Sequence, residues 1–272
     1  MKECSQYKYL HNSKLRDTSE FRNEFFRRGL SLYEVIRVMN SKPVFLKEHL
    51  IRLENSAKQV GQFVWLNYSE LVEKIELVIS RNGVRNGNIK IVFNIHQNNR
   101  NFYCYFVHHN YPDSQAYLEG VNTVVYNAER SHPNAKVYNH ELRTYTNSII
   151  ESPEIFEVIL MDNLNHITEG SRSNLFFIKA DRLVTAPDDM VLNGIVRGKI
   201  IEICARMGIP VFKEDIPFET LSNYDAAFLT GTSPQILPIR SINAISFDVN
   251  HPLLKQLLEA YRKEIVHYFE LI

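Results

Sequence analysis

Two residues in this chain combine a reactive side chain with a local sequence that could hold it in place. Glu169 lies in "ITEGSRSNLFFI" (167–178), where an acid, a glycine and several hydrogen-bonding side chains precede a short apolar run. Lys136 lies in "NAKVYNHEL", between a Pro-Asn turn and a predicted helix. Such residues are usually a turn acid and a solvated surface charge. A buried lysine, however, has a lowered pKa and can form a Schiff base.

Three further features could bind an anion. In "LNGIVRGK", Gly194 precedes a predicted helix, where converging amides and the helix dipole favour phosphate. In "LTGTSPQ", a predicted strand ends in Gly231, Thr232 and Ser233, which offer hydroxyls and amides. Arg52 stands at the edge of a helical apolar stripe, where an arginine can clamp a phosphate in a bidentate manner. Each feature alone is more often an ordinary turn or an arginine that reaches into solvent.

Taken together, these features supply an amine, a carboxylate, an arginine and two amide cradles. Pyridoxal 5'-phosphate (PLP) needs this set of groups. Its aldehyde reacts with a lysine, its ring nitrogen needs an acid to stay protonated, and its phosphate is bound by arginine and helix amides. The set therefore predicts a PLP site.

The first third of the chain is predicted to be a small α+β unit. Segment 29–46 alternates as two strands around a polar turn. An apolar stripe over 46–60 predicts one helix, and 69–80 predicts another with Ser69 as its N-cap. Two strands joined by a polar hairpin follow within 88–108.

The rest of the chain predicts a second unit with a mixed sheet. The turn-rich segment "HHNYPDSQAYLEG" indicates a linker, and several apolar strands, two internal helices and a helix from about Pro252 follow it. We therefore expect an α/β chain of the α+β type. Its predicted parts are a small domain over 1–112, a linker over 113–120 and a larger PLP-binding domain over 121–272.

Composition excludes several classes of protein. The 272 residues include 31 basic and 31 acidic side chains, so the basic excess typical of nucleic-acid binding is missing. The cysteines have no CxxC spacing, and the pair His108–His109 has no third ligand nearby in sequence, so no metal site is expected. The chain starts without an apolar leader and contains no apolar run of roughly 20 residues. We expect a soluble, cytoplasmic protein.

Several of these motifs, in this order, resemble the class IV (fold-type IV) PLP-dependent aminotransferase family. That family contains branched-chain and D-amino acid aminotransferases and aminodeoxychorismate lyases. The resemblance covers about residues 29 to 240, with "LYEVIRVMNSKPVFLKEHLIRLENSA", "KVYN", "ITEGSRSNLFFI", "LNGIVR" and "AAFLTGTSPQILPI" as landmarks. It implies a small α/β sandwich domain, a larger pseudo-barrel domain with PLP in the cleft, and usually a homodimer.

The resemblance also implies roles for individual residues. Glu169 would pair with the pyridinium nitrogen of PLP. Lys136 would bind the cofactor covalently and then move the substrate proton between Cα and C4′. Arg52 would bind the phosphate. The other implied contacts are the cofactor-binding residues Gly194, Ile195, Val196, Gly231 and Thr232, and the substrate-binding residues Tyr33 and Ser233.

Three departures from the family pattern concern the substrate side of the site. The motif before Glu34 reads "GLSLYE", without the Gly-Asp-Gly run that the family often has. Glu141 stands where branched-chain enzymes generally place a tyrosine, with Tyr138 and His140 as substitutes. The strand "IVFNIHQ" lacks the central arginine with which D-amino acid enzymes bind the substrate carboxylate, and Arg100 in the following hairpin is the nearest replacement.

Three functions are therefore weighed. The leading one is an aminotransferase that moves an amino group between an amino acid and a 2-oxo acid by a ping-pong mechanism. The alternative is a 4-amino-4-deoxychorismate lyase that releases pyruvate and 4-aminobenzoate, with which the tripeptide "NGI" is also compatible. The third is a binding protein that has kept the fold and lost turnover, which the altered substrate-side positions suggest.

Overall fold

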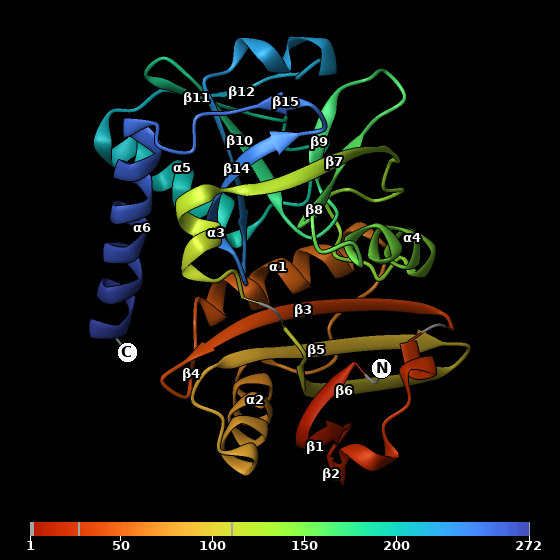
Figure 1. Ribbon diagram of the computed structural model, residues 1–272. Coiled ribbons are helices and arrows are strands. Elements are labelled where there is room, and N and C mark those ends of the chain that lie inside the picture. The colour runs from red at the N-terminus through yellow and green to blue at the C-terminus, as the bar shows by residue number, and fades with distance from the viewer. Residues whose placement is uncertain (1–2, 27, 110, 272) are drawn as a thin grey trace. The chain divides into compact units, whose positions relative to one another are not determined.

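The structure, a computed structural model, shows two compact units. It describes residues 3–26, 28–109 and 111–271. The units are Met1–Asn110 with Ala135–Tyr138, and Tyr111–Asn134 with Asn139–Ile272. Each unit combines a sheet with helices, so the predicted α+β class is confirmed (Figure 1). Over the described residues, no helix is both long and apolar enough to cross a bilayer.

The first unit contains a six-stranded sheet in the order β2-β1-β6-β5-β3-β4, with every neighbouring pair antiparallel. Its strands are β1 (Cys4–His11), β2 (Lys14–Asp17), β3 (Leu30–Met39), β4 (Lys42–Pro43), β5 (Gly87–His96) and β6 (Asn99–Val107). Its helices are α1 (Leu46–Gln59) and α2 (Tyr68–Asn82), with the short 3-10 turns η1 (Thr18–Glu20) and η2 (Asn23–Phe26).

Strand β5 explains the long apolar run in this part of the sequence, because both of its faces are covered. Ile89, Ile91 and Phe93 pack with α1 and α2 in one core cluster. Val92, on the opposite face, packs in a second cluster that is rich in tyrosine and phenylalanine. Alternating residues of a strand point to opposite faces, so a strand covered on both sides needs apolar residues at nearly every position.

The predicted strand pairs and helices of this unit are present, with two adjustments at their ends. The turn between β3 and β4 uses Asn40 and Ser41 with φ of 51° and 62°, values typical of a two-residue hairpin, and β4 is only two residues long. The N-cap of α2 is Asn67, whose side chain forms a capping box with Glu70, so the predicted cap at Ser69 was wrong.

The second unit contains a nine-stranded mixed sheet in the order β12-β11-β10-β13-β14-β7-β8-β9, with β15 paired to β14. Its strands are β7 (Val121–Asn127), β8 (Glu157–Met161), β9 (Ile167–Gly170), β10 (Asn174–Lys179), β11 (Arg182–Thr185), β12 (Val211–Lys213), β13 (Ala226–Gly231), β14 (Gln235–Ile242) and β15 (Ile245–Ser246). The pairs β11–β12, β14–β7 and β7–β8 are parallel, so the predicted mixed sheet is confirmed.

This unit also contains four helices among the described residues. They are α3 (Ser114–Glu119), α4 (His140–Ile150), α5 (Ile195–Met207) and α6 (Pro252–Glu270), with the 3-10 turn η3 (Phe218–Asn223). Helix α3 lies in the segment expected to be a linker, where Asp113 caps it through a hydrogen bond from the amide of Ala116. Gly208 ends α5 in the left-handed conformation (φ 69°), as its position after the apolar stripe predicted.

Candidate active site

Lys136 packs within the first unit. Its carbonyl accepts a hydrogen bond from the amide of Tyr33 on β3 at 3.1 Å, and its amide donates to Ser56 Oγ on α1 at 3.1 Å. Its Nζ lies 4.8 Å from the centroid of the Tyr33 ring. The backbone of Lys136 is therefore held by two elements that lie far from it in sequence, and its half-buried amine lies against an aromatic ring.

A second lysine, which the sequence reasoning missed, shares the same ring. Nζ of Lys90 lies 4.7 Å from the Tyr33 centroid and 4.9 Å from that of Tyr138, and it forms an ion pair with Glu3 at 2.5 Å. Lys90 is only 3% exposed. A lysine is almost never fully buried without a partner. A lysine inside the apolar run of β5 was the sequence signal for this arrangement.

Arg52 is held by a buried carboxylate. Glu34 on β3 is completely buried and accepts hydrogen bonds from Arg52 Nε at 2.8 Å and from Nη2 at 2.6 Å. Nδ1 of His49 donates to the same carboxylate at 2.7 Å. Arg52 and His49 both lie on α1, one turn apart. The guanidinium that was predicted to bind phosphate is thus oriented by Glu34, for which sequence reasoning gave no such role.

The pKa values in this cluster follow from burial and charge. Burial alone would raise the pKa of Glu34, but the charge and hydrogen bonds of Arg52, with a hydrogen bond from His49, outweigh it and lower the pKa to about 2. Burial lowers the pKa of His49 and outweighs the opposing attraction of Glu34. His49 is therefore a neutral donor to an ionised Glu34.

Glu169 lies in the second unit, on strand β9 rather than in the turn that the sequence suggested. It is 2% exposed. Its Oε2 accepts hydrogen bonds from Asn174 Nδ2 and from the amide of Leu192, both at 3.1 Å. Its Oε1 lies 2.9 Å from Nε of Arg130, an electrostatic contact that is not aligned as a hydrogen bond. Glu169 is thus a buried carboxylate in a fixed position.

The turn after Glu169 is organised by a second buried acid, Glu157 on β8. Its carboxylate accepts hydrogen bonds from Ser171 Oγ at 2.7 Å and from Ser173 Oγ at 3.0 Å. The carbonyl of Ser171 in turn accepts a hydrogen bond from Nη2 of Arg130 at 2.9 Å. The hydroxyls that follow Glu169 in the sequence therefore donate hydrogen bonds to Glu157. Arg130 links this turn to Glu169.

Asn174 brings three distant segments of the chain together. Its side-chain nitrogen donates to Glu169 and, at 2.7 Å, to the carbonyl of Leu192. In the sheet it pairs directly with Thr230 of β13. A Cβ added to Gly194 would lie 2.0 Å from Asn174 Oδ1, so a larger residue there would require one of the two to shift. Asn174, missed by the sequence reasoning, therefore connects Glu169 with both predicted amide cradles.

These cradles have features that suit an anion. Helix α5 has a glycine as its N-cap, so no side chain caps its first amides, which include those of Ile195 and Val196. The hydroxyl of Thr230, at the end of β13 just before Gly231, is buried and has no hydrogen-bond partner among the described residues. A buried polar group of this kind usually has a partner. The residues of this unit therefore fit a bound phosphate.

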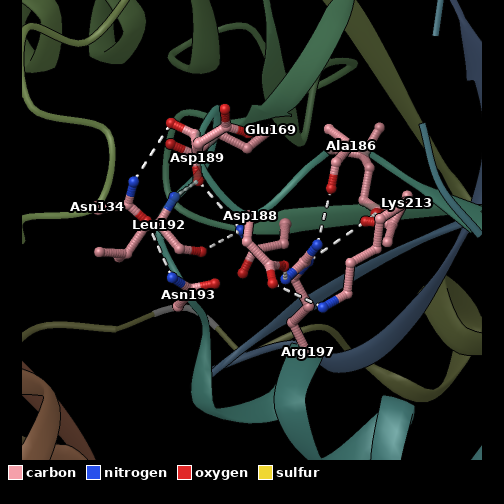
Figure 2. A network of polar contacts seen from close by, with 12 residues as sticks. Asn134, Glu169, Ala186, Asp188, Asp189, Leu192, Asn193, Arg197 and Lys213 are labelled. Atoms are coloured by element: carbon pink, nitrogen blue, oxygen red, sulfur yellow. Dashed lines mark hydrogen bonds and ion pairs between the residues drawn. The ribbon is translucent and has the colours of Figure 1, made fainter. Parts of the chain in front are cut away.

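The structure thus groups the predicted residues in two sets. Lys136, Arg52 and Tyr33 lie together in the first unit, and Glu169 lies with the loop before α5 and the β13 turn in the second. Figure 2 shows Glu169 with Leu192 and the network that continues along this loop. Arg100 lies apart from the first set, with its guanidinium 4.3 Å from the Phe63 ring.

A lysine amine, a buried carboxylate and anion cradles are the kinds of group that PLP requires. The chain matches the class IV amino-transferase family over residues 31–242, and it belongs to that family.

Relatives support this assignment. The chain is 29% identical over 251 residues to a probable branched-chain-amino-acid aminotransferase of Rickettsia conorii, covering 86% of each chain. It is 29% identical over 271 residues to a D-alanine aminotransferase of Listeria monocytogenes, covering 91% of each. A solved branched-chain amino acid aminotransferase of Escherichia coli shares the fold with a TM-score of 0.84 at 24% identity, covering 96% of this chain and 95% of that one.

Several predictions from the sequence are thereby confirmed. The chain is an aminotransferase of class IV, and enzymes of this class use PLP. The fold of the solved relative agrees with the predicted fold-type IV architecture. Both curated relatives named above carry aminotransferase names, which favours amino transfer over the lyase alternative.

Proposed function

We propose that Lys136 is the amine that binds PLP covalently and that Glu169 is the acid at the nitrogen of its ring. The observation that carries this proposal is the buried Glu169 carboxylate, which Asn174 and the Leu192 amide fix beside the start of α5. A carboxylate at this nitrogen favours the protonated ring. PLP, when bound, supplies an electron sink for the bonds at the substrate Cα.

Lys136 would also act on the substrate. Its amine would take the substrate proton from Cα and deliver it to C4′ of the cofactor. The contact with the Tyr33 ring and the hydrogen bonds that hold the Lys136 backbone limit the positions of this amine. An amine held near both atoms can move the proton between these two carbons, which flank the substrate nitrogen, without a large rearrangement.

The phosphate of PLP would be bound by Arg52, by the amides of Ile195 and Val196, and by Gly231 and Thr232. Support comes from the Glu34 ion pair, which orients Arg52, and from the open amino end of α5. Gly194 allows the helix to begin close to Asn174. Tyr33 and Ser233 are proposed to contact the substrate.

The substrate pair would be an amino acid and a 2-oxo acid. The relatives named above act, by their names, on branched-chain amino acids and on D-alanine, so these amino acids form the first panel to test. Purified protein with PLP is mixed with each amino acid and a 2-oxo acid acceptor, and both the new 2-oxo acid and the new amino acid are measured. We expect equal amounts of the two products. Pyruvate release from 4-amino-4-deoxychorismate without an acceptor would instead establish the lyase.

A homodimer and a cytoplasmic location remain proposals that rest on the family. The cysteines Cys4, Cys104 and Cys204 are buried and form no disulfide, which is compatible with a reducing compartment. Light scattering after gel filtration should give the mass of two chains. A single-chain mass at micromolar concentration would contradict the dimer.

A further inference from the structure

The loop between β11 and α5 is closed by a buried arginine that the proposed chemistry does not use. Arg197, in the first turn of α5, is 3% exposed. Its Nη1 pairs with Asp188 Oδ1 at 2.7 Å and its Nη2 donates to the carbonyl of Ala186 at 2.8 Å. Its Nε lies 3.4 Å from Thr185 Oγ1. Figure 2 shows this side chain reaching back from the helix to the start of the loop.

The first turn of a helix is an unfavourable place for a buried cation, so Arg197 needs acceptors close by. The amino end of a helix carries positive partial charge, which disfavours a positive side chain there. Burying a guanidinium also removes its hydration, which its partners must replace. Three acceptors from one short stretch of chain, 185–188, make that replacement. The arginine therefore ties the beginning of the loop to the helix that ends it.

The far part of the same loop supports the groups proposed to face PLP. The amide of Leu192 donates to Glu169, and its carbonyl accepts from Asn174. Asn134 joins the loop at two further points, through the carbonyl of Asp189 at 3.3 Å and the side chain of Asn193 at 2.9 Å. A loop tied at its start, middle and end has little freedom to move the Leu192 amide or the first amides of α5.

We propose that Arg197 is a positioning residue for the cofactor site, an inference that rests on the proposed function. It sets the loop 186–194 so that the Leu192 amide stays on Glu169 while the α5 amides stay in place for the phosphate. Asp188 is its main partner. Lys213 binds the other oxygen of Asp188 at 2.6 Å, but it lies on the surface and, among the described residues, reaches the loop through this carboxylate alone.

The test compares PLP binding to the apoproteins of Arg197→Lys, Arg197→Met and Asp188→Asn, with Lys213→Met as the matched control. Because a small misplacement of binding groups is costly, we expect both Arg197 variants to raise the Kd for PLP about tenfold or more. Asp188→Asn should raise it less, and Lys213→Met should leave it nearly unchanged. Kd is measured by titration at a temperature where thermal unfolding shows each apoprotein to be fully folded.

Hydrogen exchange of the apoproteins gives a second measurement that needs no cofactor. Amides of 186–194 should exchange faster in Arg197→Lys than in the unaltered protein, with β13 as an unchanged internal reference. If Arg197→Met does not fold, Asp188→Asn and Arg197→Lys decide the question.

An unchanged Kd and unchanged exchange in folded Arg197→Lys would overturn the inference, as would an equal loss of affinity in Lys213→Met. These outcomes leave the proposed function standing if the unaltered protein binds PLP. Failure of the unaltered protein to bind PLP would overturn the proposed function, and this inference with it.

Discussion

The carboxylate of Glu34 accepts two hydrogen bonds from the guanidinium of Arg52, at 2.8 Å and 2.6 Å, and is completely buried. The pair joins β3 to α1. Because Tyr33 is the neighbour of Glu34 on β3 and contacts Lys136, one strand orients both the proposed phosphate ligand and the proposed catalytic amine.

Replacing Glu34 by glutamine should destabilise the protein. Removing one partner of a buried ion pair leaves the other charge buried, and the loss is about 3 kcal/mol in the free energy of unfolding. Urea unfolding of the apoprotein measures it. The control is Glu20→Gln, which removes the exposed pair with Arg16 and should change stability by less than about 1 kcal/mol. Equal losses in the two variants would show that Glu34 is not a buried support for Arg52.

The same cluster should make stability depend on pH. His49 has a lowered pKa in the fold, so on acidification the unfolded chain takes up the histidine proton at a higher pH than the folded protein does. Stability therefore falls as the pH drops below about 6.5. Glu34 has a pKa lowered from 4.5 to about 2, so its contribution is present above 4.5 and is lost as the pH falls towards 2.

The His49 part is measured by comparing the unaltered protein with His49→Gln between pH 7.5 and pH 5.5, a window of about one unit on either side of the ordinary histidine pKa. The unaltered protein should lose stability more steeply on acidification than the variant does. Parallel curves in this window would contradict the assignment of His49 as neutral in the fold.

Two glycines of one helix region provide a matched pair for the phosphate cradle. In Gly194→Ala the new Cβ would lie 2.0 Å from Asn174 Oδ1, so either the asparagine or the start of α5 must move. In Gly198→Ala nothing lies within 4 Å of the new Cβ, and alanine inside a helix stabilises it by about 0.5–1 kcal/mol.

We therefore expect Gly194→Ala to weaken PLP binding and Gly198→Ala to preserve it. Titration of the two apoproteins with PLP measures both constants. If Gly194→Ala binds PLP as tightly as Gly198→Ala does, the role assigned to the first amides of α5 is wrong.

Glu169→Gln tests the proposed acid at the ring nitrogen. Glutamine keeps the size and the hydrogen-bond acceptor but removes the negative charge, so kcat for amino transfer should fall by about 100-fold or more. Covalent attachment of PLP should persist, because it depends on Lys136. Glu129→Gln, at an exposed position near Arg130, is the control and should keep its kcat. Normal turnover by Glu169→Gln would show that the charge of Glu169 is not needed for the reaction.

Much of the fold could be predicted from local sequence, because its signals lie within single elements. The apolar runs of β5 and β6 and the glycines after α2 and α5 mark strands and helix ends by local geometry alone. Strand β9 was taken for a turn because it has only four residues and its pairing with β8 is irregular. A strand this short carries too few residues for an alternating pattern.

The predicted residues Lys136, Glu169 and Arg52 stood out because the family motifs contain them. Their supporting residues did not stand out, since Asn174, Arg130 and Arg197 act through contacts with segments that are distant in sequence. An asparagine at the start of a strand has no pattern that reveals which carbonyl it will meet. Only the register of β10 with β13 and the path of the loop before α5 bring these groups together.

The central claim is that Lys136 binds PLP covalently, and borohydride trapping tests it most directly. The protein loaded with PLP is reduced with borohydride, digested and mapped by mass spectrometry, with Lys90→Met as a control for the other lysine at the Tyr33 ring. We expect the reduced cofactor on Lys136 in the unaltered protein and in Lys90→Met, and no adduct in Lys136→Ala. An adduct on Lys90 or on any other lysine, with Lys136 unmodified, would contradict the claim.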